Sequence, residues 1–275
     1  MNAAFRGESE VIDHEFQGIW TGRFLPVTIA IIVVMGLAAF DGMAVIAALP
    51  SIAADLGDVA LLPWVMTAYM GTSAVAVLIG GPVIDAIGVR RTFRVTGLWF
   101  LMASAAAAVA PSMPLLVAVR VVHGFGAGLV MAVVLATVGL AYPAALRRRA
   151  FAAVSMVWGV MSFGGPALAG LLLSVGGWRF VFAVQLPLTT LALAVGWSTL
   201  PGTRRRPTAI STDWVGVGLI SSIVALLLAA VGQIGIRWSV TGGTAALAVA
   251  AGAVYWWHAG RVNEPILERT HITRF

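Results

Sequence analysis

Long apolar stretches separated by short polar connections dominate the chain. Eight of these stretches approach or exceed the length of about 20 residues that a bilayer core of about 30 Å requires at a helical rise of 1.5 Å per residue. Helices are expected throughout, because barrel strands would be half as long and would alternate in polarity. The pattern therefore predicts an all-α polytopic membrane protein with about eight transmembrane helices. The expected spans are residues 25–49, 61–84, 95–109, 115–141, 151–175, 180–200, 214–234 and 238–257.

Composition excludes a soluble protein and several kinds of chemistry. The 275 residues are 60% hydrophobic and only 10% charged, whereas soluble proteins carry roughly 25% charged residues. Cysteine is absent, which excludes disulfides, thiolate nucleophiles and cysteine-ligated metals. The four histidines lack metal-ligand spacing, and no nucleophile lies near a base in a recognisable motif. We therefore expect no enzyme activity, no catalytic residues, no metal site and no cofactor.

The basic residues predict how the chain crosses the membrane. All 17 are arginine, and fourteen of them fall on one side of an alternating eight-span arrangement, against Arg179 and Arg237 on the other. By the positive-inside rule, both termini are expected in the cytoplasm. The positive charge is thus explained by topology, and nucleic-acid binding is not needed to account for it. We expect a multi-pass protein of the plasma (inner) membrane that has lipids as partners.

Three ionisable residues lie well inside the apolar spans: Asp41, Arg120 and His123. A charge near mid-membrane costs about 2.5 to 3.5 kcal/mol, so such residues normally face a partner or a cavity. Counted from the expected span ends, Asp41 lies about 13 Å and Arg120 about 9 Å below the same outer surface. His123 is three residues from Arg120 and shares its helix face. The residues alone leave two interpretations open: a static ion pair, or a carboxylate whose protonation responds to substrate.

The connection after the second span resembles a known family signature. Residues 81–93 read GPVIDAIGVRRTF, which is similar to the loop G-x-L-a-D-r-x-G-r-r of the major facilitator superfamily. Ala86 and Val89 stand where that pattern usually has basic residues. In the family this loop gates the cytoplasmic side of the transporter. The candidate gate residues implied by the resemblance are Gly81, Asp85, Gly88, Arg90 and Arg91.

Four further stretches resemble the same family, and two of these are specific to its drug/proton antiporter branch. Residues 41–50 (DGMAVIAALP) and 165–170 (GPALAG) look like the antiporter signatures of the first and fifth spans, which singles out Gly165, Pro166 and Gly170. We also expect Pro166 to bend or loosen the fifth span. The other two stretches are similar to general family patterns. In residues 116–126 His123 replaces the usual Gln, and in residues 178–187 Gln185 replaces the usual Asn.

The resemblance implies a domain organisation close to the N-terminal half of the 14-span antiporters. The expected parts are a cytoplasmic segment (1–24), a six-helix transporter domain (25–200), a cytoplasmic arginine-rich loop (201–213), two linker transmembrane helices (214–258) and a cytoplasmic tail (259–275). That tail is expected to lead into a second half that the chain lacks.

The resemblance also implies a function. It is the export of a small lipophilic or cationic compound in exchange for protons, with Asp41 carrying the proton or meeting the cation and Arg120 tuning it. Two alternatives stay open. The chain could be a truncated product or a half-transporter that needs a second half or a second copy. It could also be a proton-coupled importer of a metabolite.

Overall fold

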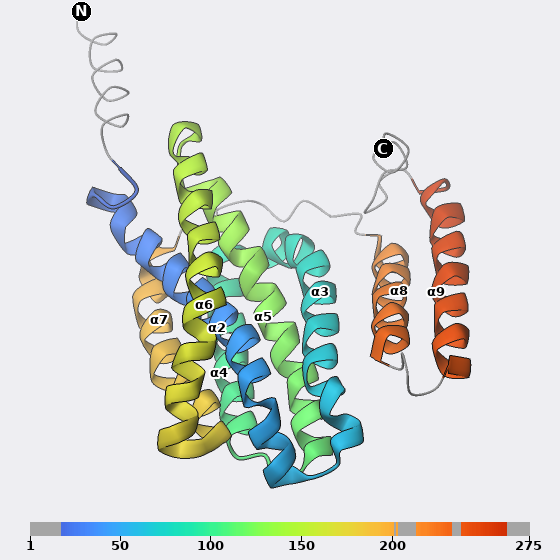
Figure 1. Cartoon of the computed structure of the whole chain (residues 1–275). Helices are drawn as coiled ribbons and strands as arrows, with labels where there is room; N and C mark the ends of the chain where they lie inside the picture. Colours follow the sequence, from blue (N-terminus) through green and yellow to red (C-terminus); the bar gives the residue numbers. More distant parts are fainter. Residues whose placement is uncertain (1–17, 201, 203–212, 233–237, 263–275) are drawn as a thin grey trace, which may run out of the picture.

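The computed structural model describes residues 18–200, 202, 213–232 and 238–262. Within these ranges the chain forms eight α-helices and two short 3-10 helices and no strand, which confirms the all-α fold class (Figure 1). The α-helices are α2 (Leu25–Leu56), α3 (Leu62–Ile87), α4 (Val89–Ala108), α5 (Met113–Ala141), α6 (Ala144–Ala183), α7 (Gln185–Thr199), α8 (Trp214–Gly232) and α9 (Trp238–Ala259); the 3-10 helices are η1 (Gly22–Phe24) and η2 (Val59–Leu61). Expectations for residues 1–17, for most of the loop 201–213 and for the tail beyond residue 262 lie outside the described residues.

Helices α2 to α7 run up and down as a bundle, and α8 and α9 form a hairpin beside it (Figure 1). The bundle is built from two main pairs, α2 with α6 and α3 with α5, while α4 and α7 pack against each other and against these pairs. The hairpin joins the bundle through α8, which packs against α3. We call the end at which α4 and α6 begin the arginine-rich end, because Arg90, Arg91, Arg94 and Arg147 to Arg149 lie there; the other is the opposite end.

Six of the helices in the described ranges are long and apolar enough to cross a membrane. The two that fall short are α4, which has three arginines in its first six residues, and α7, which has only 15 residues. Both pack within the bundle between helices that do meet the criterion. The protein is therefore a multi-pass membrane protein.

Several helix ends differ from the sequence prediction. Pro50 was expected to end the first span, but α2 continues through it to Leu56. Proline is tolerated inside membrane helices where neighbouring groups satisfy the freed backbone. Asp41 consequently lies in the middle of α2, about 22 Å from its end by helix rise, instead of about 13 Å as predicted. The arginines at 147–149 also lie in the first turns of α6 and not in a loop.

The break within α6 lies at Gly177, in the connection expected between the fifth span, which ends at residue 175, and the sixth, which begins at residue 180. Helix α6 stays continuous through Pro166, and Gly177 is its one residue with a non-helical backbone, at φ 69° and ψ −173°. Glycine suits this position because a side chain is strained at positive φ. Trp178 therefore begins a new helical segment at the opposite end of the bundle, and α7 continues it. Together the segment and α7 form the predicted sixth span.

Glycines let α3 and α5 approach closely. A Cβ atom on Gly124 would overlap the backbone oxygen of Tyr69, and one on Gly128 would overlap the backbone oxygen of Ser73. Small residues at such contacts allow membrane helices to gain van der Waals packing at short separation. The glycines of α5 thus position the helix that carries Arg120 and His123 against α3.

We expect Gly128→Ala to lower the free energy of unfolding by about 1 to 3 kcal/mol, because the added methyl group must push α5 away from α3. The matched control is Gly139→Ala on the same helix, where a Cβ would meet no atom within 4 Å. Alanine there should be neutral or stabilise by up to about 1 kcal/mol. Thermal unfolding of the purified chain in detergent, followed by circular dichroism, measures both. Equal midpoints for the two variants would contradict the close packing.

Candidate functional site

Asp41 and Arg120 form an ion pair at the centre of the bundle. The Oδ2 atom of Asp41 on α2 lies 2.7 Å from Nη1 of Arg120 on α5, and both side chains are fully buried. The Nε atom of Arg120 donates a second hydrogen bond, of 3.1 Å, to the backbone oxygen of Val65 on α3. One pair of charges therefore links three helices.

Three more polar side chains complete a closed circuit of hydrogen bonds around the pair. Arginine only donates, so the 3.1 Å contact from Arg120 Nη1 makes Nδ1 of His123 an acceptor. His123 is then neutral with its proton on Nε2, which donates to Ser104 Oγ at 3.1 Å. Ser104 in turn donates to Oε1 of Gln185 at 3.5 Å, and Nε2 of Gln185 donates to Oδ1 of Asp41 at 3.0 Å.

The five members of this buried polar circuit are Asp41, Ser104, Arg120, His123 and Gln185. They come from α2, α4, α5 and α7, and all five side chains are fully buried. Sequence reasoning placed Asp41, Arg120 and His123 together but did not include Ser104 and Gln185 among the candidate site residues. The only signal for these two residues was a polar side chain within an apolar span. That signal is weak, because such a side chain can instead form a hydrogen bond with a backbone oxygen of its own helix.

Aromatic rings enclose the charged part of the circuit. The guanidinium carbon of Arg120 lies 3.9 Å from the ring centre of Tyr69 and 5.8 Å from that of Phe182. Phe100 packs on the imidazole of His123 with ring centres 4.3 Å apart. Within the described residues Nη2 of Arg120 is buried without a hydrogen-bond partner, so its charge is stabilised by Asp41 and by the faces of the rings. The enclosure excludes water and raises the cost of leaving either charge alone.

The predicted gate residues lie at the arginine-rich end, around the turn between α3 and α4. Gly81 and Asp85 are on α3, and Gly88 forms the turn with a φ of 84°, which favours glycine. Arg90 on α4 donates a 2.7 Å hydrogen bond to the backbone oxygen of Leu200, just after α7. Arg91 is exposed.

A second arginine of α4 makes the same kind of contact. Arg94 donates to the backbone oxygen of Trp197 at 2.6 Å and stacks on its indole ring. Cations at a helix C-terminus stabilise its unpaired carbonyl groups. The arginines of α4 therefore also hold the end of α7, a role that counting charges for topology does not reveal.

The antiporter motif on α6 brings one of its three residues into contact with α2. A Cβ atom on Gly165 would lie 2.9 Å from Cβ of Met43, two residues after Asp41. Pro166 and Gly170 are exposed, and a Cβ on Gly170 would meet no atom within 4 Å. Gly165 therefore sets how closely α6 approaches the helix that carries the buried carboxylate.

Polar contacts also hold the opposite end of the bundle together. Asp55 near the end of α2 is in an ion pair with Arg179 and accepts a 3.0 Å hydrogen bond from the indole nitrogen of Trp178. Arg179 also donates to the backbone oxygen of Ala110, after α4, at 3.1 Å. The segment that begins after the Gly177 break is thereby fixed to α2 and α4. Sequence reasoning did not identify Asp55, because its partners are more than 100 residues away in the chain.

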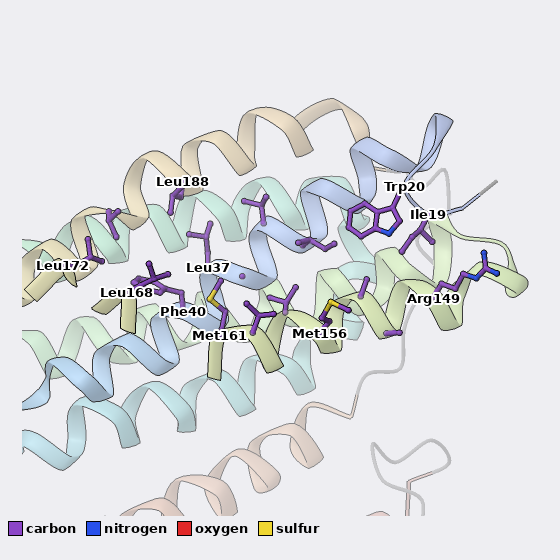
Figure 2. A pocket seen from close by; sticks show the side chains of 18 of the residues that line it. Ile19, Trp20, Leu37, Phe40, Arg149, Met156, Met161, Leu168, Leu172 and Leu188 are labelled. Carbon is purple, nitrogen blue, oxygen red and sulfur yellow. The ribbon is translucent and has the colours of Figure 1, made fainter. Parts of the chain in front are cut away.

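An apolar groove of about 920 Å³ lies between α2, α6 and α7, on the side of the bundle away from α3 and α8 (Figures 1 and 2). Phe40 lines this groove, whereas its neighbour Asp41 does not. No member of the buried polar circuit borders it. The groove and the circuit are thus separate features of the same bundle.

Comparison with known proteins gives one consistent family. Residues 31–212 match the family model of the Major Facilitator Superfamily. The multidrug transporter protein MdtP of Bacillus subtilis (strain 168) is 32% identical over 215 residues, which cover 78% of this chain and 39% of MdtP. The probable multidrug-efflux transporter Rv1634 of Mycobacterium tuberculosis (strain ATCC 25618 / H37Rv) is 36% identical over 169 residues, 62% of this chain and 36% of Rv1634.

A relative whose name gives a different cargo also matches this chain. The riboflavin transporter RibZ of Clostridioides difficile (strain 630) is 28% identical over 210 residues, 75% of this chain and 46% of RibZ. The chain therefore spans less than half the length of each of these three relatives.

We expect Asp41→Asn to destabilise the protein more than the double variant Asp41→Asn/Arg120→Gln. The single change leaves the guanidinium buried without a counter-charge, which costs about 3 to 5 kcal/mol, whereas the double change removes both charges. Denaturant unfolding of the purified chain in detergent measures the difference. The single variant Arg120→Gln completes the comparison. If the loss of unfolding free energy in the double variant equalled the sum of the losses in the two single variants, the two charges would not be coupled.

Proposed function

The chain belongs to the Major Facilitator Superfamily, and from this premise we propose that its helices serve a proton-coupled efflux transporter for small lipophilic or cationic compounds. The activity is proposed for the transporter to which these helices contribute, since the chain spans 39% of MdtP. The observation that carries the proposal is the buried polar circuit centred on Asp41. The name of Rv1634 gives multidrug efflux and that of MdtP multidrug transport, and both support the proposed activity.

The circuit provides a physical reason for coupling protons to helix movement. Both oxygens of Asp41 already accept hydrogen bonds, one from Arg120 on α5 and one from Gln185 on α7. A proton on either oxygen competes with the N–H donor already bound there, so protonation is expected to weaken at least one of these contacts. It also leaves the charge of Arg120 without its counter-ion in a medium of low dielectric. Proton binding is therefore expected to loosen α2 from α5 or α7.

A cationic substrate would act in the opposite sense. It favours the ionised carboxylate, so the proton and the cation compete for Asp41. The remaining acidic residues in the described ranges, Asp55, Asp58, Asp85 and Asp213, lie at or near helix ends and not at the bundle centre. Asp41 is accordingly the group to which we assign the coupling, with Arg120 and His123 biasing it. Protons are the coupling ion, and no cofactor is invoked.

The gate and the orientation in the membrane complete the proposal. We place the cytoplasm at the arginine-rich end, in line with the positive-inside rule, and the protein in the plasma membrane. The cytoplasmic gate then comprises Gly81, Asp85, Gly88, Arg90 and Arg91. The hydrogen bond from Arg90 to Leu200 ties α4 to the end of α7 and so holds the gate residues in place within the bundle. Gly165 and Pro166 shape the helix α6 that packs on α2.

A second candidate function is the proton-coupled import of a metabolite. The observation that favours it is the similarity to RibZ, whose printed name gives riboflavin as its cargo. The same circuit would then couple inward proton movement to uptake. The two candidates differ in direction and cargo, and a single reconstituted preparation can separate them.

The partner of these helices is also part of the proposal. Superfamily transporters bind substrate between two halves that rock against each other. We propose that these helices act with a second six-helix half, or with a second copy of the chain, to enclose the cavity.

We expect the wild-type transporter, reconstituted in liposomes with its second half or as a pair of copies of the chain, to accumulate tetraphenylphosphonium when a pH gradient is imposed, and not without one. Asp41→Asn should reduce the gradient-dependent rate at least tenfold, because asparagine cannot exchange a proton. The matched control is Asp58→Asn, which changes an exposed acid in the α2–α3 connection and should leave the rate unchanged. Circular dichroism of each variant confirms that the helices are intact.

Three results of this experiment decide between the candidates. Wild-type rates in Asp41→Asn would refute the coupling role. Gradient-driven movement of riboflavin without movement of tetraphenylphosphonium would favour the importer. Gradient-driven transport by the chain on its own as a monomer would remove the need for a second half or a second copy.

A further inference from the structure

The apolar groove between α2, α6 and α7 has a consistent chemical character along its length. Its walls are almost entirely aliphatic, with Met156 and Met161 on α6 and Leu188 on α7 among them (Figure 2). Its floor includes Gly36, which has no side chain; a Cβ atom there would lie 3.8 Å from Met161 and Val157, in ordinary van der Waals contact. The volume of about 920 Å³ lies at the upper end of the range for ligand cavities, roughly 300–1,000 Å³.

One end of the groove is different. Among the described residues, Arg149 is the only charged one that lines it, and Trp20 lies across from Arg149 at the same end (Figure 2). Both residues are exposed, and Arg149 has no hydrogen bond or ion pair with any other residue in the described ranges. A guanidinium binds phosphate oxygens in a bidentate manner, and tryptophan favours the headgroup region of a bilayer. This end is therefore suited to an anionic headgroup.

The length of the groove fits a lipid tail. From Arg149 to Val160 is about 17 Å along α6, close to the depth of about 15 Å that one leaflet contributes to the bilayer core. A lipid with its phosphate at Arg149 would lay an acyl chain past Met156 to Val160, both of which are exposed on the groove wall. The groove also lies away from α3, the helix against which α8 packs, so its side is not covered by the hairpin.

We propose that this groove is a binding site for an anionic phospholipid of the leaflet at the arginine-rich end. Arg149 binds the headgroup phosphate, Trp20 packs at the level of the headgroup, and the apolar groove that Gly36 helps to line takes an acyl chain. A lipophilic cation is a poor occupant because the one charge that lines the groove is positive. The site does not border the buried polar circuit, so it is independent of the coupling role of Asp41.

Native mass spectrometry of the purified 275-residue chain tests this assignment, with phosphatidylglycerol and phosphatidylcholine of identical acyl chains as the probes. We expect wild-type protein to retain phosphatidylglycerol at least fivefold more than phosphatidylcholine. Arg149→Gln should reduce this preference to near unity. The matched control, Arg148→Gln, removes the same charge from a neighbouring exposed position that does not line the groove and should keep the preference.

A second pair of variants tests the acyl-chain site. Gly36→Leu adds a large side chain to the floor of the groove and should abolish retention of both lipids. Val160→Trp fills the groove from an exposed position, and it gives the same readout if Gly36→Leu fails to fold. Three results would each overturn the proposal. Wild type could retain both lipids equally, or Arg148→Gln and Arg149→Gln could lose the preference for phosphatidylglycerol equally. The third result is full lipid retention in a folded groove-filling variant. A lipid-free dimer would instead assign the groove to a second copy of the chain and would overturn it as well.

Discussion

The ion pair of Asp41 and Arg120 is the constraint on which the packing of the bundle depends. Two opposite charges in an apolar interior are stable only if each satisfies the other and the remaining donors and acceptors find partners. Asp41 is therefore bound by Arg120 and Gln185, and Arg120 by Asp41, His123 and the backbone of Val65. These requirements fix the rotation of α2, α5 and α7 about their axes more strictly than apolar packing does. Close contact through the glycines of α5 then brings α3 against the same site.

The two ends of the bundle are held by a different kind of interaction. At the arginine-rich end, Arg90 and Arg94 on α4 donate to backbone oxygens at the end of α7. At the opposite end, Arg179 and Trp178 bind Asp55 of α2. These contacts lie near the helix ends, where breaking a hydrogen bond costs less than in the apolar centre. The centre is thus the most strongly determined part, and the ends are the parts that can rearrange.

The positions of the apolar spans and of the buried charges could be predicted from the sequence, because an apolar solvent penalises every exposed polar group. Helix ends were less accurate, since Pro50 ends a helix in water but is tolerated inside α2. Helix α6 likewise continues through Pro166, and its backbone departs from helix at Gly177, in the connection predicted between the fifth and sixth spans, where only glycine adopts the observed φ without strain. The contribution of Asp55 depends on residues distant in sequence and left no local pattern.

The sequence by itself determined that the chain crosses a membrane as a set of helices, that Asp41, Arg120 and His123 must find partners, and which family its motifs resemble. Hydrophobic length and the cost of burying charge act locally, so they can be read from one segment at a time. The tertiary structure decided that Ser104 and Gln185 close the hydrogen-bond circuit and that Arg149 lies at the end of an apolar groove. Both features depend on how helices from distant parts of the chain rotate and pack against one another. The composition of a single span does not specify that relationship.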